Sequence, residues 1–435
     1  MIWKTAEIAG WGRALKATAE IARPERFAAL PGLSTEGPAI GMRRSYGDAC
    51  LNSGGRVIDM TRMDRFLAFD GATGELSVEA GATIGDIARA FAPRGWLPAV
   101  MPGTGFATVG GAIANDVHGK NHHGAGSFGQ HLASITLIQG GLPVTITPEK
   151  QPELFRATVA GLGQTGMIAS AVLRLIPARG DLMMVTERRV DGWDEHIARL
   201  DASAATYAVG WIDATATGAA LGRGIVEEAE TGSGLVPARK PGKRVAFDAP
   251  GFALSAPVVR LFNAAYWRRV PAAGRTVVKP ITDFFFPLDR IRDWNRLYGR
   301  RGFHQFQCVV PLARAEALRA MLERIAQVGI ASPLAVLKRM GPGRGGMLSF
   351  PMEGYTLAVD FPNRGRAAAL IEELHAMTEA AGGRIYLAKD SLLRPGRLVA
   401  MYPELAAWRR ATARADPERR METDLTRRLN LRGSA

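Results

Sequence analysis

The alternation of apolar and polar positions is clearest between residues 302 and 391. The run FHQFQCVVP has the composition of a strand, and LARAEALRAMLERIAQVG follows with Leu318, Leu322 and Ile325 on one helical face before Gly329. Two strand-like runs, PLAVLKRMG and GYTLAVDFP, then precede a second amphipathic stretch, RAAALIEELHAMTEAAGG, and a last strand-like run, RIYLAKDS. The order β-α-β-β-α-β predicts a ferredoxin-like unit.

The first 180 residues have a different pattern. Short apolar runs such as GRVIDM and GELSVEAGATIG alternate with glycine-rich turns, which predicts many short strands with interspersed helices. One helix is expected from Thr83 to Arg94. No strand leads into a Gly-x-Gly-x-x-Gly helix entry, so a parallel Rossmann domain is not indicated. Residues 181 to about 300 show no regular period, and we expect irregular structure with mobile loops there.

Length and cysteine content place the chain among two-domain intracellular proteins. A chain of 435 residues is too long for one compact core. Cys50 and Cys308 are its two cysteines, so we expect packing residues in a reducing cytoplasm rather than a disulfide framework. The start, MIWKTAEIAGWGRAL, lacks the layout of a signal peptide, and no apolar run approaches the ~18 residues of a membrane span.

The net charge of +14 is the unusual bulk property. It is compatible with nucleic acid, an anionic membrane surface or acidic ligands such as phosphates, and also with the arginine-rich usage of a G·C-rich genome. No RNA- or DNA-binding motif accompanies it. The excess is concentrated in residues 237–244, 266–279 and 296–303 and in the C-terminal region.

Four of the seven histidines lie in GGAIANDVHGKNHHGAGSFGQH, residues 110–131. His118 and His122 have the spacing of two metal ligands on one helical turn, but Gly119 and Gly124 disfavour a helix and no cysteine or acidic pair stands at ligand spacing. The stretch GAGSFGQ does not match the Gly-x-Ser-x-Gly elbow of a hydrolase. Neither a metal site nor a Ser–His–Asp site is therefore favoured.

Glycine-rich loops offer a third reading of the same stretch. Glycine lets backbone N–H groups approach a diphosphate closely and form anion-binding nests. Each loop alone is compatible with a tight turn, but together they favour a pocket for a large dinucleotide. The three loops are residues 41–55, 101–127 and 161–168.

These residues carry a resemblance to a known family. RRSYGDACLNSGG, PGTGFATVGGAIANDVHGKNHHGAGSFG and YLAKDS are similar to motifs of the vanillyl-alcohol-oxidase-type FAD oxidoreductases, which have a PCMH-type FAD-binding domain. Within them the chain most resembles the oxidase subunits of decaprenylphosphoryl-β-D-ribose 2'-epimerases, almost end to end. The resemblance implies an α+β, two-domain fold. Its parts would be an FAD domain at 1–180, an antiparallel-sheet substrate domain at 181–383, and a segment at 384–435 that returns to the FAD domain.

The resemblance also implies a set of FAD contacts. The cofactor would be non-covalent, because the branch has dissociable FAD, and His118 would make a polar contact rather than a covalent link. His122, His123 and His131 are expected to support the loop through hydrogen bonds. The implied FAD-binding residues are Arg43, Arg44, Ser45, Tyr46, Gly47 and Asp48 within the loop Ala39 to Ala49, then Gly103, Thr108, Val109, Gly110, Gly111, Asn115, Asp116, His118, Ile168 and Tyr386.

The activity implied by the resemblance is oxidation of the 2'-hydroxyl of a polyprenylphosphoryl-β-D-ribose to a ketone, with hydride transfer to flavin N5. Lys389 would act as base or hydrogen-bond donor, with Tyr46 and His118 beside the flavin. A surface lysine next to Asp390 and the wet face of an antiparallel strand remain the alternatives for Lys389 and for the two glutamines. The implied substrate-binding residues are Trp211, Gln305, Gln307, Lys338, Thr356 and Ala358.

Three positions depart from the pattern of the family. Ala358 stands where some members carry a cysteine that covalent inhibitors attack, so thiol-directed chemistry is expected to fail here. Thr356 replaces an asparagine, and Phe285 stands where a tyrosine is common. Each change removes or shortens a polar group at the substrate, which bears on the choice of sugar and lipid.

The implied partners follow from this chemistry. An NAD(P)H-dependent keto-reductase would complete the epimerisation, and a quinone or oxygen would reoxidise the flavin. The basic surface would bring the protein into peripheral contact with the anionic cytoplasmic face of the inner membrane, with no nucleic-acid partner. Two rival readings are a sugar-lactone or alditol oxidase of the same scaffold, and a non-catalytic nucleic-acid- or membrane-binding protein.

Overall fold

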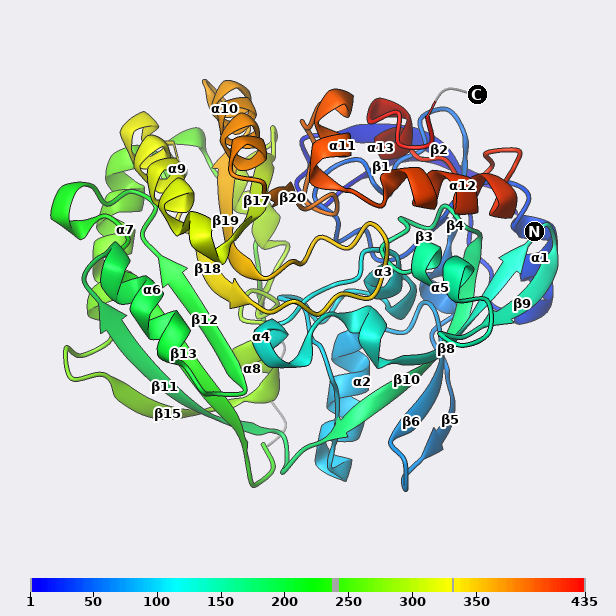
Figure 1. Cartoon of the computed structure of the whole chain (residues 1–435), viewed down its shortest axis with the longest axis horizontal. Helices are drawn as coiled ribbons and strands as arrows, with labels where there is room; N and C mark the ends of the chain where they lie inside the picture. Colours follow the sequence, from blue (N-terminus) through cyan, green and yellow to red (C-terminus); the bar gives the residue numbers. More distant parts are fainter. Residues whose placement is uncertain (1, 237–241, 331, 434–435) are drawn as a thin grey trace.

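The computed structural model describes residues 2–236, 242–330 and 332–433, and Figure 1 shows their arrangement. The first 180 residues contain two sheets. One has four strands in the order β1-β2-β4-β3, and the other has the order β5-β6-β10-β8-β9 with β7 paired to β10. Their strands are β1 (Lys4–Ala9), β2 (Lys16–Ala22), β3 (Ala39–Ile40), β4 (Arg56–Asp59), β5 (Phe66–Asp70), β6 (Glu75–Glu79), β7 (Trp96–Pro98), β8 (Leu132–Gln139), β9 (Leu142–Ile146) and β10 (Met167–Pro177).

Short helices connect these strands. The helix expected over residues 83–94 is confirmed: the Thr83 side chain caps it by accepting from Asp86 N, and Gly95 ends it in the left-handed conformation. Its apolar side, which includes Ile84, Ile87 and Phe91, is buried in the core. The helices of this region are α1 (Leu30–Leu33), α2 (Ile84–Phe91), α3 (Val109–Ala114), α4 (His122–Ala125) and α5 (Pro152–Thr158).

The ferredoxin-like unit predicted for residues 302–391 is present. Its strand order is β18-β19-β17-β20, which is the 2-3-1-4 order of that motif, and both helices pack on one face. Gly329 adopts a left-handed conformation and ends the first helix, as expected. The elements are β17 (Phe303–Pro311), α9 (Ala315–Val328), β18 (Ala335–Met340), β19 (Gly354–Pro362), α10 (Ala367–Ala380) and β20 (Arg384–Ile385).

Residues 182–280 form a second unit of the same kind. The expectation of irregular structure there was wrong, because the strand order β15-β11-β13-β12 repeats the 4-1-3-2 order. A long connection separates β13 from the second helix, so the alternation of strands and helices is not evident in the sequence. Its elements are β11 (Leu182–Val190), α6 (Trp193–Ala202), β12 (Tyr207–Ile212), β13 (Gly224–Gly232), α7 (Ala256–Arg268) and β15 (Arg275–Pro280).

The two units join edge to edge into one eight-stranded sheet. The seam lies between β12 and β18, where Gly210 pairs with Leu337 and Trp211 pairs with Val336. Because successive side chains of a strand point to opposite faces, the sheet buries one set of side chains under its helices and turns the other set toward the first 180 residues. This second face forms a wall of the site described below.

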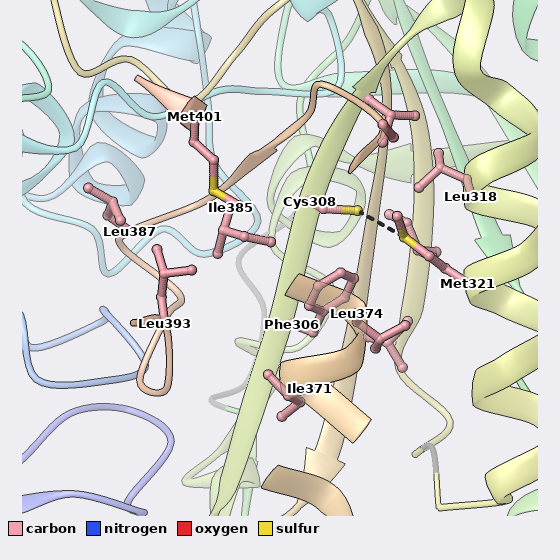
Figure 2. Close-up of a cluster of buried hydrophobic side chains, with 14 of the residues drawn as sticks. Phe306, Cys308, Leu318, Met321, Ile371, Leu374, Ile385, Leu387, Leu393 and Met401 are labelled. Carbon is pink, nitrogen blue, oxygen red and sulfur yellow. Dashed lines mark hydrogen bonds between the residues drawn. The ribbon is translucent and has the colours of Figure 1, made fainter. Parts of the chain in front are cut away.

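The helix-covered faces of the two units share the largest hydrophobic core, and Figure 2 shows the part of it that includes the unit at residues 302–391. Leu318, Met321 and Leu374 from the two helices meet Phe306 and Cys308 of β17 there, and all five are almost fully buried. The Cys308 thiol lies 4.0 Å from the Met321 sulfur. Cys308 is therefore a packing residue, as the sequence predicts.

The C-terminal segment runs back along the first 180 residues. Asp424 N donates to Leu51 O at 2.8 Å, and the Trp408 indole donates to Ala157 O at 3.1 Å. These contacts support the division into residues 1–180, 181–383 and 384–435, which stays a prediction. The segment contains α11 (Leu398–Met401), α12 (Leu405–Ala415) and α13 (Asp424–Arg428). Within the described residues, no helix is long and apolar enough to cross a bilayer.

The strand predicted for residues 384–391 is shorter in the structure. RIYLAKDS was expected to be a strand, but the strand ends at Ile385 and the chain turns, with Lys389 N donating to Tyr386 O at 2.9 Å. The turn brings Lys389 toward the ring of Tyr46 instead of leaving it on a flat sheet face.

Candidate active site

A cavity of about 1130 Å³ lies between the glycine-rich loops and the open face of the eight-stranded sheet. Its walls come from loops near residues 39–50, 101–120 and 162–168 and from strands of both ferredoxin-like units. A cavity of this size, walled by few loops and one sheet face, is large enough for a dinucleotide together with a second ligand.

Most of the residues predicted for the site line this cavity. Lys389 and all six predicted substrate residues, Trp211, Gln305, Gln307, Lys338, Thr356 and Ala358, are among them. The predicted cofactor residues that line it are Arg43, Arg44, Ser45, Tyr46, Gly103, Thr108, Gly110, Gly111, Asn115, His118, Ile168 and Tyr386.

Four predicted cofactor residues lie behind the lining and support it. Val109 is fully buried in the core, and a Cβ on Gly47 would lie 1.9 Å from a backbone oxygen. Asp48 accepts from both ends of the Arg428 guanidinium, at 2.7 and 2.9 Å. Asp116 is fully buried and accepts from Ser127 Oγ at 2.7 Å. A sequence motif alone does not separate such supports from contacts.

The loop over residues 42–45 has the chemistry of an anion site. Among the described residues, none accepts a hydrogen bond from the backbone N–H groups of this loop. Arg43 has a φ of 53°, a left-handed conformation that turns successive N–H groups toward one side. The first turn of α3 is different, because the N–H groups of Val109 and Gly110 donate to Ala82 O and Ala80 O. A diphosphate therefore fits the first loop better than the helix start.

Buried polar atoms without a partner also belong to residues that line the cavity. Arg44 Nε and Asn115 Oδ1 have no hydrogen-bond partner among the described residues, although unpaired buried polar groups are costly. The Arg44 guanidinium stacks 4.0 Å from the centroid of the Trp11 ring, which fixes its position. Together with the free N–H groups, these atoms fit a large polar cofactor such as FAD.

Lys389 lies in the wall of the cavity. Its ammonium is 3.8 Å from the centroid of the Tyr46 ring, and burial lowers its pKa to about 8, against the opposing attraction of Asp360. Burial also raises the pKa of Tyr46 well above its usual value, so this phenol stays protonated. A lysine of this pKa exchanges a proton near neutral pH, which is what a general base requires.

A buried carboxylate lies behind this pair. Asp360 is fully buried, accepts from Gln305 Nε2 and accepts from Tyr298 OH at 3.0 Å. Gln305 in turn hydrogen-bonds Tyr46, so Asp360 fixes the amide that faces the cavity. Burial raises the pKa of Asp360 to about 7, and no cation of the described chain forms an ion pair with it. Asp360 was not predicted; its alternation with Thr356 and Ala358 along β19 is the signal that identifies it.

His118 connects three polar side chains. Its Nδ1 lies 3.0 Å from Lys338 Nζ and its Nε2 lies 3.1 Å from the Gln307 amide, which also contacts Thr356 Oγ1 at 3.2 Å. The Gln307 amide nitrogen can only donate, so His118 Nε2 accepts from it, and the one proton of the neutral imidazole on Nδ1 is donated to the neutral amine of Lys338. Burial and Lys338 lower the pKa of His118 well below its usual value.

Lys338 has the most perturbed lysine pKa of the cavity. Burial, with repulsion from Lys120 and Lys389, lowers it to about 7. Burial likewise lowers the pKa of Lys120 to about 8, although Glu227 opposes the shift. Burial is the largest cause of all three lowered pKa values, and an anion bound among these lysines would raise them again.

A charged cluster at the far end of the cavity was not predicted from the sequence. Glu187 is fully buried and accepts from Lys279 at 2.6 Å and Arg275 at 2.7 Å, and Arg269 is its third cation. Glu227 shares Lys279 at 2.9 Å and lies 3.7 Å from the ammonium of Lys120. The charged residues within the apolar alternation of β11 and β13 are the signal for this cluster.

The other histidines of the glycine-rich stretch bond to the backbone. His123 Nε2 contacts Ala205 O at 2.9 Å, His131 Nε2 contacts Ala125 O at 2.8 Å, and His122 Nδ1 accepts from Gly341 N at 3.2 Å. In the described part of the chain, no three His, Cys, Asp or Glu side chains gather as a metal site would require.

The large cavity and its glycine-rich loops are those of an FAD-binding oxidoreductase, in which the cofactor and not the side chains supplies the redox chemistry. Residues 38–141 match the FAD binding domain family, and the protein binds FAD. The chain is 36% identical over 452 residues to the decaprenylphosphoryl-β-D-ribose oxidase of Mycolicibacterium smegmatis, covering 98% of each chain. It therefore belongs to the family of FAD-dependent oxidoreductases that includes this oxidase.

Two further relatives differ in how much of the chain they match. An uncharacterised protein of Streptomyces coelicolor is 35% identical over 379 residues, which are 80% of this chain and all of the relative. The D-arabinono-1,4-lactone oxidase of Eremothecium gossypii is 28% identical over 145 residues, only 32% of this chain and 27% of its own. The likeness to lactone oxidases is thus weaker and partial.

Proposed function

We propose that the protein oxidises the 2'-hydroxyl of a polyprenylphosphoryl-β-D-ribose, or of a related sugar, to a 2'-keto product. The observation that carries the proposal is Lys389, a lysine with a pKa of about 8 in the cavity that the FAD loops enclose. Similarity over the whole chain to a decaprenylphosphoryl-β-D-ribose oxidase supports this substrate class.

FAD, when bound, supplies the redox chemistry by accepting the hydride of the substrate carbon at N5. The residues of the chain handle the proton and the orientation of the sugar. Neutral Lys389 takes the proton of the reacting hydroxyl, and the protonated Tyr46 beside it keeps the site free of a competing anion. Gln305, held by Asp360, and Gln307, held by His118, present fixed amides to the remaining sugar hydroxyls.

The positive end of the cavity suits the phosphate of such a substrate. The phosphorus of a ribosyl phosphodiester is three bonds from C2', so the phosphate must bind close to the reacting carbon. Lys338 couples electrostatically to both Lys389 and Lys120, and thus lies between the base and the cationic cluster. A bound phosphodiester would lower the repulsion among these three ammonium groups.

The partners remain part of this proposal. The 2'-keto product calls for a reductase that uses a nicotinamide cofactor, and reduced FAD calls for a quinone or oxygen as acceptor. A polyprenyl substrate resides in a membrane, which the basic surface of the protein would attract. The alternative function is a sugar-lactone or alditol oxidase, which the partial similarity to lactone oxidases favours.

The test is anaerobic mixing of the FAD-loaded protein with a polyprenylphosphoryl ribose, followed by flavin absorbance. Bleaching with this lipid supports the proposal, whereas bleaching only with a soluble polyol or lactone supports the alternative. Acid precipitation that releases the flavin supports non-covalent binding. Lys389→Met is expected to keep the flavin spectrum and slow bleaching by about 10²- to 10⁴-fold. A variant that bleaches at the wild-type rate would refute the role of Lys389.

A further inference from the structure

Exposed apolar side chains are concentrated in one part of the chain. Eight of the sixteen large hydrophobic side chains that are exposed in the described residues lie between residues 242 and 301. Leu261 is 74% exposed, and Phe247 and Phe252 are each 72% exposed. An exposed apolar set of this density marks a surface that contacts something else.

Helix α7 provides the centre of this set (Figure 1). Val258, Leu261 and Phe262 are spaced three and four residues apart, so they share one side of the helix, and all three are exposed. The opposite side is anchored, because Val259 and Asn263 are buried and Asn263 Nδ2 donates to Asp213 at 2.7 Å. The helix is therefore fixed to the sheet with its apolar side facing outward.

Neighbouring segments extend the same surface. The 3-10 helix η6 (Gly251–Leu254), which carries Phe252, packs against both α7 and the 3-10 helix η7 (Trp294–Tyr298), which carries Leu297. Strand β14 (Lys243–Arg244) pairs with β16 (Ile291–Arg292), which places Ile291 beside it. We call this set the α7 surface: Phe247, Phe252, Val258, Leu261, Phe262, Ile291 and Leu297.

The exposed charged side chains around the α7 surface are all positive. Between residues 242 and 301, all of which the structure describes, no aspartate or glutamate is exposed. The four carboxylates of this stretch are partly buried, and three of them pair with arginines here: Asp248 with Arg296, Asp283 with Arg290, and Asp293 with Arg244. The exposed cations are Lys243, Arg244, Arg260, Arg268, Arg275, Arg290, Arg292, Arg300 and Arg301.

The same segments border the cavity. Arg244 precedes η6, Tyr266 and Arg269 come from the end of α7, and Ile291 and Arg292 form β16; all five line the cavity. Phe262 stacks on Tyr266 with ring centroids 5.8 Å apart, so the apolar side of the helix is continuous with the cavity wall. The α7 surface therefore borders the part of the cavity that Tyr266 and Arg269 line.

We propose that the α7 surface docks on an anionic lipid bilayer, so that the cavity opens toward the membrane. Apolar side chains enter the acyl boundary while the surrounding lysines and arginines contact anionic headgroups. The choice of a bilayer rests in part on the proposed function, because a polyprenyl substrate can then leave its chain in the lipid. A second copy of this chain does not suit the surface, since the exposed cations of one copy would face those of the other.

The experiment is co-sedimentation of the FAD-loaded protein with vesicles, without substrate. Binding to vesicles of phosphatidylcholine with 30% phosphatidylglycerol is expected to be at least about tenfold tighter than to phosphatidylcholine alone, and to weaken with salt. The double variant Leu261→Ser with Phe262→Ser is expected to lose at least about tenfold in affinity. The matched control, Leu142→Ser with Val399→Ser, removes equally exposed side chains of β9 and α11 and should bind like the wild type.

Each other outcome overturns the proposal. Absent binding of the wild type to anionic vesicles, or equal losses in the two double variants, excludes the α7 surface as the docking site. A wild-type dimer in sedimentation velocity that Leu261→Ser with Phe262→Ser converts to a monomer would assign the surface to a second copy. The proposed function is tested separately, since its flavin bleaching in detergent does not need vesicle binding and the vesicle assay contains no substrate.

Discussion

Asp360→Asn is expected to stabilise the protein above neutral pH and not to destabilise it. Asp360 is fully buried, and among the described residues no lysine or arginine forms an ion pair with it. Its pKa is raised by burial from 3.8 to about 7. Folding therefore favours its protonated form: the associated stability is fully present below pH 3.8 and is lost as the pH rises through 7.

The magnitude follows from the shift. About three pKa units correspond to roughly 4 kcal/mol at pH 8, whereas at pH 5 only about one unit, or roughly 1.6 kcal/mol, has been lost. The asparagine is isosteric and keeps partners for Gln305 and Tyr298. The advantage of Asp360→Asn should thus grow by roughly 3 kcal/mol from pH 5 to pH 8. With about 2.1 cal/mol/K of unfolding entropy per residue, this corresponds to about 3 °C in Tm.

The assay is thermal unfolding of both FAD-saturated proteins by circular dichroism at pH 5 and pH 8. Asp213→Asn serves as the control, because Asp213 is equally buried but accepts from Arg223 Nη2 at 2.7 Å. This control should destabilise the protein at pH 8, since it leaves a cation without its partner. A Tm difference between Asp360→Asn and the wild type that is the same at both pH values would refute the reasoning.

Three other predictions follow from the same side chains. The rate of flavin reduction should rise about tenfold per pH unit up to pH 8, where Lys389 becomes neutral. Asp360→Asn should move this rising part of the pH profile to lower pH, because it removes an attraction that raises the pKa of Lys389. Stopped-flow measurement of flavin bleaching against pH checks both. Burial opposes ionisation of Glu187, but the hydrogen bonds from Lys279 and Arg275 outweigh it and lower the pKa of Glu187 to about 2. Glu187→Gln should therefore lower the free energy of unfolding by roughly 3 kcal/mol above pH 4.5 and leave it unchanged near pH 2. Urea unfolding at the two pH values measures the difference. Thiol-directed reagents should leave the activity intact, since burial raises the pKa of Cys50 and Cys308 to about 12, whereas Ala358→Cys should make it sensitive; equal inactivation of both proteins would contradict this.

The sequence predicts those helices and strands that bury a single face of regularly spaced apolar side chains. α9 and α10 were found because Leu318, Leu322 and Leu374 repeat at helical spacing and meet a single core. The ferredoxin-like unit at residues 182–280 was not predicted, because its strands also carry charges such as Glu187 and Glu227 on the cavity side, which breaks the apolar alternation. Those charges make sense only beside Lys279, which lies far away in the sequence.

Most of the residues predicted for the site line the cavity, but Asp360, the cluster around Glu187 and the geometry of the site were not predicted. The motif that contains Lys389 is apolar enough to be read as a strand, and only the tertiary contact of Tyr46 N with Ala388 O reveals the turn. Asp48 and Asp116 belong to the motifs but bind Arg428 and Ser127 instead of lining the cavity. Local pattern identifies which residues a loop needs, whereas their roles depend on contacts with other segments, such as that of Asp48 with Arg428.

Under the proposed function, the seam between the two ferredoxin-like units would separate two kinds of selectivity. The unit that contains β17, β18 and β19 contributes the glutamine amides and Lys338 to the cavity, whereas the unit that contains β11, β13 and β15 contributes the cluster of charged side chains and carries α7. Two residue pairs join the halves across β12 and β18, and one hydrophobic core continues beneath both units. Under the proposed function, substitutions confined to the cavity face would leave that shared core in place, so the groups that face the lipid tail and those that face the alcohol would change separately.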